Sequence, residues 1–297
     1  MYEQYYGFRK KPFSLTPDPD FFYMSKDHVE ALEHLVYGIA EGAGFLLLVG
    51  EIGTGKTTIS RVLSQRLKPS IVYSLILNPF QDIVSLLKSI ITDFGLTPRC
   101  DEKSELINQL IDFLLNDIAP QGKTALIIID EAQNLSVDTL EQLRIISNIE
   151  TNKEKLIRIL LLGQEELMAK LEMEELRQLN QRISVRYFLT SLNRDDVGKY
   201  IHHRVKVAAP EREIRFTWAA IREIYKFSRG VPRLINMIAN RCLVAGFVGE
   251  TSTIDRAMVK LAKESLFGEK YLKIMKIKDK GKHNELDFGC IEKGTTG

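Results

Sequence analysis

Short runs of purely apolar residues restrict the fold of this chain more than any other feature. Phe45–Val49, Ala125–Ile129 and Ile159–Leu162 contain no polar side chain, which is typical of strands that are buried on both faces. Each run is far shorter than the roughly 18–20 residues that a membrane span requires. Strands of this kind predict a mainly parallel sheet that is flanked by helices on both sides.

The segments between the strands have the apolar spacing of helices. Helices are expected over 25–41, 56–67, 82–94, from Ser104 onward, over 136–149 and up to Leu179, and further strands over 71–77, 157–162 and 185–189. Ser25 and Ser104 are expected as N-caps, and Gly42 and Gly95 follow helix ends. Strands that alternate with helices of this length indicate βαβ units, so the predicted fold class is α/β.

The pattern changes near residue 191, after which only helices are expected: Arg194–Val207, Trp218–Phe227, Arg233–Val248 and Asp255–Leu266. At the other end, residues 1–24 are rich in aromatic residues and proline, and an irregular arm whose rings pack on the domain is expected there. The predicted domains are therefore the arm (1–24), an α/β domain (25–190), a small helical domain (191–267) and a Lys-rich, disordered tail (268–297).

One motif identifies a ligand. Gly50-Glu51-Ile52-Gly53-Thr54-Gly55-Lys56-Thr57 matches the complete P-loop pattern, and it follows a buried strand and opens a helix, as a P-loop does. The glycines let backbone N–H groups turn toward phosphates, and the helix N-terminus adds its positive dipole. The residues from Gly50 to Thr58 are therefore the candidate ATP-binding set. Lys56 supplies a charge for the β- and γ-phosphates, and the Thr57 hydroxyl is a ligand for Mg²⁺.

Two acids end the second apolar strand. In Leu126-Ile127-Ile128-Ile129-Asp130-Glu131, an Asp at this point holds Mg²⁺ in P-loop enzymes, and an adjacent Glu can polarise the attacking water. The competing interpretation is a pair of acids that only face solvent. Together with the P-loop, the acids favour ATP hydrolysis.

Composition excludes little. The chain has 41 Lys and Arg against 39 Asp and Glu, a net charge of +2, which is too small to predict nucleic-acid or membrane binding. The three cysteines are far apart in sequence, so neither a local metal site nor a disulfide is expected. No secretory signal opens the chain, and the predicted compartment is the cytoplasm.

Several further motifs resemble the ExeA/GspA-type secretion ATPases of the AAA+ superfamily over residues 1–267. They are Tyr5-Tyr6-Gly7-Phe8, Pro12-Phe13-Ser14-Leu15-Thr16-Pro17-Asp18-Pro19, Tyr37-Gly38-Ile39, Asp130-Glu131-Ala132-Gln133-Asn134-Leu135, Leu162-Gly163-Gln164, Leu176-Arg177-Gln178-Leu179-Asn180-Gln181-Arg182-Ile183 and Gly230-Val231-Pro232-Arg233-Leu234-Ile235-Asn236. The resemblance implies an AAA+ P-loop NTPase whose α/β domain is followed by a helical lid. It also places the arm near the nucleotide, where one of its rings would flank the adenine.

The resemblance also implies roles for individual residues. Gln164 occupies the position of the polar sensor 1 that positions the lytic water. Arg233 matches the sensor 2 arginine of the lid. Arg182 lies where an arginine finger reaches the γ-phosphate of a neighbouring subunit, with Arg177 and Arg186 as competitors for that role. An arginine suits such positions because it stays charged and binds phosphate oxygens in a bidentate manner. A finger that acts in trans requires a homo-oligomer.

The function implied is an ATPase that couples its cycle to the assembly or operation of an envelope secretion or export system, with a membrane or envelope protein as partner. Relatives of the type II secretion systems continue into a membrane span and a peptidoglycan-binding module. Neither is expected here, so contact with the inner membrane would run through a partner. The alternatives are a DNA-associated helper ATPase of the TniB transposition type, which the sequence does not favour, and a nucleotide-gated switch with little turnover.

Overall fold

The computed structural model describes residues 1–79, 82–150, 155–266 and 268. The chain divides into two compact units, each formed by discontinuous segments. The first unit contains Thr16–Asp196 and Gly230–Arg233. The second contains Met1–Leu15, Val197–Arg229 and the residues after Arg233. The first fifteen residues of the predicted arm therefore pack with the C-terminal helices.

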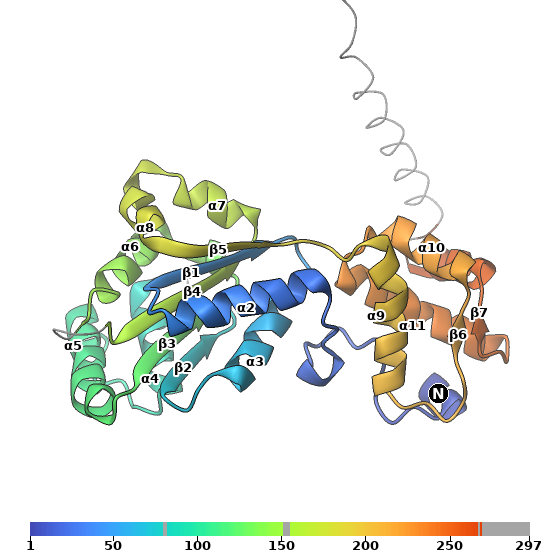
Figure 1. Cartoon of the computed structure of the whole chain (residues 1–297), viewed down its shortest axis with the longest axis horizontal. Helices are drawn as coiled ribbons and strands as arrows, with labels where there is room; N and C mark the ends of the chain where they lie inside the picture. Colours follow the sequence, from blue (N-terminus) through green and yellow to red (C-terminus); the bar gives the residue numbers. More distant parts are fainter. Residues whose placement is uncertain (80–81, 151–154, 267, 269–297) are drawn as a thin grey trace, which may run out of the picture. The chain divides into compact units, whose positions relative to one another are not determined.

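A five-stranded parallel sheet forms the centre of the first unit, in the order β2-β3-β4-β1-β5 (Figure 1). The strands are β1 (Phe45–Gly50), β2 (Ile71–Ile76), β3 (Thr124–Ile129), β4 (Ile157–Gly163) and β5 (Ile183–Leu189). The strands β1, β3 and β4 are central and almost completely buried, which explains their purely apolar sequences. This sheet confirms the predicted fold class.

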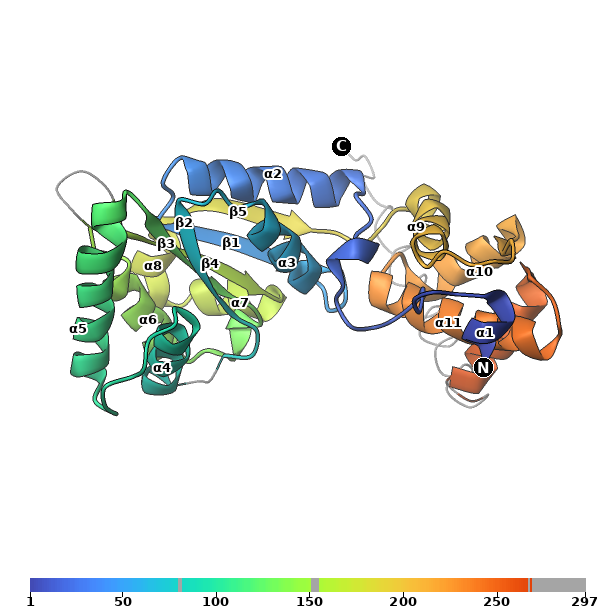
Figure 2. The same cartoon turned by 90° about the horizontal axis from the view of Figure 1, so that it is seen from below.

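Helices cover both faces of the sheet, and α2 lies on the side opposite α4 and α6 (Figure 2). One face, with Leu46 and Leu48, packs on α2 (Lys26–Ala40) and α3 (Lys56–Arg66). The other face, with Leu47 and Val49, packs on the remaining helices. These are α4 (Ile83–Asp93), α5 (Lys103–Phe113), α6 (Val137–Ile146), α7 (Glu165–Leu171) and α8 (Arg177–Arg182), with the short helical segments η2 (Leu114–Ile118), η3 (Ala119–Gln121), η4 (Ala132–Asn134) and η5 (Glu174–Leu176). The short helix η1 (Pro19–Phe21) contacts α3 instead.

Local signals set most helix starts. The Ser25 hydroxyl accepts a hydrogen bond from the amide of His28 and caps α2, as the sequence predicts. The expected Ser104 cap is wrong, because α5 begins one residue earlier, at Lys103, with Glu102 in the cap position. Glycine also allows close packing of α2 on the sheet, since a Cβ at Gly38 would lie 2.6 Å from Val185 Cγ2.

The second unit contains α9 from Val197 onward (α9 as a whole is Arg194–Val207), α10 (Trp218–Ser228), most of α11 (Pro232–Val248) and helical residues 256–266. The expectation of helices alone is wrong, because β6 (Arg215–Phe216) and β7 (Thr253–Ile254) form a short parallel pair. Among the described residues, no helix has both the length and the apolar character that crossing a membrane would take.

The prediction that no helix forms in the arm is also wrong. Tyr2–Tyr6 form the short helix α1, which ends at Gly7 in the left-handed conformation. The first proline of the chain is Pro12, so nothing in this segment prevents a helical turn. The buried Tyr6 hydroxyl donates to the carbonyl oxygens of Leu243 and Thr251, which holds α1 on the second unit.

Candidate nucleotide-binding site

The P-loop connects β1 to α3, and its glycines are required by its shape. Gly53 and Gly55 have φ values of +83° and +111°, which residues with a Cβ rarely adopt. A Cβ at Gly50 would lie 2.6 Å from the carbonyl oxygen of Leu189 on the neighbouring strand β5. The loop therefore has the conformation in which backbone N–H groups can surround phosphate oxygens.

Three carbonyl oxygens of the loop are fixed from outside it or by its own side chains. The Thr54 hydroxyl donates to the Glu51 carbonyl at 2.9 Å. The Arg233 amide donates to the Gly53 carbonyl at 3.2 Å. The ring of His28 on α2 contacts the Thr54 carbonyl through Nε2, at 3.0 Å. These contacts orient the peptide groups of the loop.

Lys56 is the first residue of α3, and only 5% of it is exposed. Its Nζ donates to the carbonyl oxygens of Gly50 at 2.7 Å and Glu51 at 3.0 Å. Burial lowers the pKa of Lys56, while the nearby carboxylates, led by Glu131 and Asp130, oppose this shift. A buried ammonium group at this position is suited to bind a polyphosphate, whose negative charge would offset the cost of burial.

Thr57 and Asp130 form the candidate magnesium site. The Thr57 hydroxyl donates to Asp130 Oδ2, which joins the start of α3 to the end of β3. Asp130 is 2% exposed, and burial raises its pKa. A hydroxyl and a buried carboxylate are oxygen ligands of the kind that Mg²⁺ prefers, and a cation would favour the ionised form of the acid. These two side chains fit a magnesium ion.

Glu131 is held in a strained conformation beside this pair. It has a φ of 53°, in the left-handed region that is uncommon for residues other than glycine. Its Oε2 accepts hydrogen bonds from Gln133 Nε2 at 2.5 Å and from Gln164 Nε2 at 2.9 Å. Gln164 directly follows β4. The side-chain amide that is predicted as sensor 1 is therefore hydrogen-bonded to the carboxylate that is predicted as the general base.

Two residues of the site were not singled out from the sequence. Gln133 contacts both Glu131 and, through Oε1, the backbone amide of Gln164 at 3.2 Å. His28 lies between the Ser25 hydroxyl, 2.6 Å from its Nδ1, and the Thr54 carbonyl. A histidine on the face of an amphipathic helix gives no sequence signal for such a contact.

The Gly230–Arg233 turn places Arg233 beside the P-loop. Gly230 has a φ of +85°, and a Cβ there would overlap the carbonyl oxygen of Leu192, so only glycine fits. The Leu192 amide donates to the Gly230 carbonyl at 3.0 Å. The Arg233 side chain is exposed, and its Cβ lies 2.6 Å from the point where Gly53 would carry a Cβ. The predicted sensor 2 arginine thus adjoins the phosphate-binding loop.

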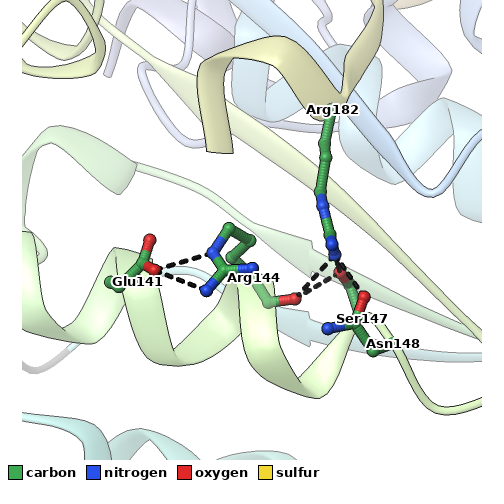
Figure 3. A network of polar contacts seen from close by, with 5 residues as sticks. All are labelled: Glu141, Arg144, Ser147, Asn148 and Arg182. Carbon is green, nitrogen blue, oxygen red and sulfur yellow. Dashed lines mark hydrogen bonds and ion pairs between the residues drawn. The ribbon is translucent and has the colours of Figure 1, made fainter. Parts of the chain in front are cut away.

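Arg182 lies away from these groups, at the end of α8 (Figure 3). Its guanidinium donates to the Arg144 carbonyl at 3.3 Å, to the Ser147 hydroxyl at 3.4 Å and to Asn148 Oδ1, at the C-terminus of α6. Of its competitors, Arg186 donates to Asn180 Oδ1 at 2.6 Å, and Arg177 is exposed. Of the remaining P-loop residues, Glu51 and Ile52 are exposed and Thr58 is half-buried on α3.

Comparisons with known proteins agree with this fold. Residues 39–171 match a family model described as an AAA domain. General secretion pathway protein A of Aeromonas hydrophila is 43% identical over 269 residues, which are 90% of this chain and 49% of that protein. The chain has the AAA+ fold and fits the ExeA/GspA type. It spans about half the length of this curated relative.

Solved structures support the AAA+ fold independently. The Aeropyrum pernix ORC2 protein aligns over 86% of this chain and 71% of its own, with a TM-score of 0.65 and 17% identity. Cdc6p of Pyrobaculum aerophilum aligns over 86% and 70%, with a TM-score of 0.68 and 17% identity. The Thermotoga maritima RuvB branch migration motor aligns over 86% and 73%, with a TM-score of 0.51 and 18% identity. At such identities the similarity concerns the fold alone.

The contact between His28 and the P-loop generates the first prediction. The Thr54 carbonyl can only accept, so His28 Nε2 carries the proton and Nδ1 accepts from Ser25. Burial lowers the pKa of His28, which favours this neutral ring. We expect His28→Ala to weaken ATP binding about tenfold, because the Thr54 peptide would lose the hydrogen bond, of about 1–1.5 kcal/mol, that holds it in the phosphate-binding orientation. Isothermal titration with ATP measures the change.

The matched control is His28→Gln, whose amide can replace the Nε2 donor and should bind within about threefold of the original chain. Thermal unfolding of both variants separates a binding defect from a loss of fold. A folded His28→Ala protein with unchanged ATP affinity would exclude a positioning role for the ring.

Proposed function

We propose that the chain binds ATP with Mg²⁺ and hydrolyses it. The observation that carries this proposal is the position of Glu131, a carboxylate fixed by two amides next to the P-loop lysine and the buried Asp130. Among the described residues, no cation forms a hydrogen bond with this carboxylate, and a carboxylate held in place in this way is suited to accept a proton from water.

Each residue of the site has a defined task in this proposal. Backbone amides from Gly50 to Thr58 bind the phosphates, and Lys56 exchanges its two loop carbonyls for phosphate oxygens. Thr57 and Asp130 hold the magnesium ion, which supplies positive charge where negative charge develops. Gln164 keeps Glu131 oriented, and Arg233 binds the γ-phosphate from the turn that opens α11.

The substitution Glu131→Gln tests the chemical role. It keeps the size of the side chain and removes the base, so hydrolysis should fall at least 100-fold while ATP affinity stays within about threefold. Phosphate release and ATP titration on the same preparation measure the two quantities. Lys56→Ala should instead lose ATP binding.

Glu166→Gln is the matched control for this experiment. Glu166, in the first turn of α7, also raises the pKa of Lys56 through its negative charge. It has no part in the proposed chemistry. Hydrolysis should therefore survive in this variant. Equal losses in Glu131→Gln and Glu166→Gln would show that only the electrostatic field of the acids matters, and would overturn the assignment of the base.

We also propose that the chain acts as a homo-oligomer in which Arg182 completes the site of the next subunit. The end of α8, next to an edge strand of the sheet, is a position from which a long side chain can reach a second copy. Arg182 also has a structural task, since it binds carbonyl and side-chain oxygens at the C-terminus of α6. A test must therefore separate loss of the finger from loss of stability.

Mixing two inactive variants distinguishes loss of the arginine finger from loss of stability. Arg182→Ala keeps its own P-loop and Lys56→Ala keeps its finger, so a mixed interface contains one intact site. In a random equal mixture, about a quarter of the head-to-tail interfaces have this composition, and hydrolysis should return to about that fraction. A stability defect cannot be repaired in this way.

Arg177→Ala and Arg186→Ala serve as parallel variants in the same assay. The residue whose variant is complemented by Lys56→Ala is the finger. Absence of complementation for Arg182→Ala, in preparations that form oligomers, would refute the assignment of Arg182.

The similarity to general secretion pathway protein A supports a further proposal: the ATP cycle drives assembly or operation of an envelope secretion or export system. A membrane or envelope protein would then bind the ATP state of this chain. Glu131→Gln, loaded with ATP in a lysate, should retain such proteins, whereas Lys56→Ala should not. Duplex DNA that is retained by Glu131→Gln and released by nuclease would instead contradict the secretion role.

A further inference from the structure

The small net charge of the chain conceals a strong separation of charge between its two units. The first unit has 19 Lys and Arg against 27 Asp and Glu, a net charge of −8. The second, counted to residue 266, has 15 against 7, a net charge of +8. A basic unit in the same chain as an acidic one points to an anionic partner of the basic unit.

Part of this charge is concentrated on two neighbouring helices of the second unit. The nearly buried carboxylate of Glu223 on α10 binds three cations at once. Lys226 Nζ lies 3.4 Å away, Arg256 Nη2 3.2 Å and Lys263 Nζ 3.6 Å. These contacts join α10 to helical residues 256–266. One negative charge cannot balance three positive ones, so the junction keeps an excess of positive charge.

Helical spacing extends this excess along both helices. Trp218, Arg222 and Lys226 follow one another at intervals of four residues on α10, and all three are exposed. Lys260 is exposed as well and lies one turn beyond Arg256, on the side of its helix that meets Glu223. We call this surface the α10 face, and it consists of Trp218, Arg222, Lys226, Arg256 and Lys260, together with the exposed Leu261 and Glu264, which lie three residues apart on the second helix. With one acid against four cations, the surface keeps a positive charge.

The α10 face also exposes two large apolar side chains. Trp218 is 84% exposed on α10, four residues before Arg222, and Leu261, which follows Lys260 in sequence, is 58% exposed on the second helix. Since contact with water is unfavourable for both, their position among cations indicates a partner that accepts apolar groups as well as positive charge.

We propose that the α10 face binds the surface of an anionic lipid bilayer. A bilayer surface interacts favourably with the cations, with the tryptophan and with the leucine. Anionic lipid headgroups attract Lys and Arg, the indole ring prefers the membrane–water interface, and a leucine can enter the boundary of the acyl chains. The phosphates of duplex DNA would attract the cations but gain nothing from Leu261. This inference does not depend on ATP hydrolysis.

Trp218 is the only tryptophan of the chain, so its fluorescence reports on the α10 face alone. The full chain is titrated with vesicles of three parts phosphatidylcholine to one part phosphatidylglycerol. The expected result is a blue shift of the emission and sedimentation of the protein with the vesicles. Both should be reversed by high salt. Pure phosphatidylcholine vesicles should give neither.

The double variant Arg222→Ala/Lys260→Ala tests the residues. Each removed cation should weaken binding to the anionic vesicles about fivefold, so the pair should weaken it about 25-fold. The matched control is Lys26→Ala/Arg99→Ala, which removes two exposed cations from the first unit and should change binding less than twofold. Far-ultraviolet circular dichroism verifies that both variants fold.

Three results would overturn the proposal: no binding to anionic vesicles, equal binding to neutral ones, or an equal loss in the control variant. A duplex oligonucleotide is added in a parallel titration at the same salt concentration. If the duplex binds and shifts the Trp218 emission while the vesicles do not, the partner of the α10 face is nucleic acid.

Discussion

The parallel pairing of β1, β4 and β3 is the constraint on which the candidate site depends. Residue Val49 pairs with Gly163, and Leu161 pairs with Ile129, so the three strands end at the same edge of the sheet. The P-loop follows β1, Gln164 follows β4 and Asp130 follows β3. Three segments that are far apart in sequence, with the P-loop and Gln164 more than a hundred residues apart, thereby meet without any loop having to reach across the fold.

Burial explains why Lys56 and Asp130 require ligands of opposite charge. It lowers the pKa of Lys56 and raises that of Asp130, so each group is charged at a cost. Polyphosphate oxygens and a divalent cation are the partners that offset this cost, one for each group. The conformation of Glu131 is a further local cost, with its φ of 53°. Its two amide partners and the tight turn after β3 maintain it.

Signals that act over a few residues were sufficient to predict the sheet, most helices and the P-loop. Contacts between distant segments were not predictable in this way. The helix α1 forms where Tyr6 is buried against Leu243 and Thr251, and the pair β6–β7 joins segments almost forty residues apart. His28 shows the same limit within the site, because its contact with Thr54 depends on the packing of α2 rather than on any motif.

Net charge illustrates how composition can hide function. The first unit carries a net charge of −8 and nevertheless contains the loop that fits an anionic nucleotide. Phosphate binding there depends on oriented backbone dipoles and one buried lysine rather than on the overall field. Two of the cations around Glu223, Lys226 and Arg256, by contrast lie on exposed helix surfaces, where only the sum of many charges is effective. Such a surface suits an extended anionic partner, while the P-loop suits a small one, so the two units can each engage a negative ligand by different physical means.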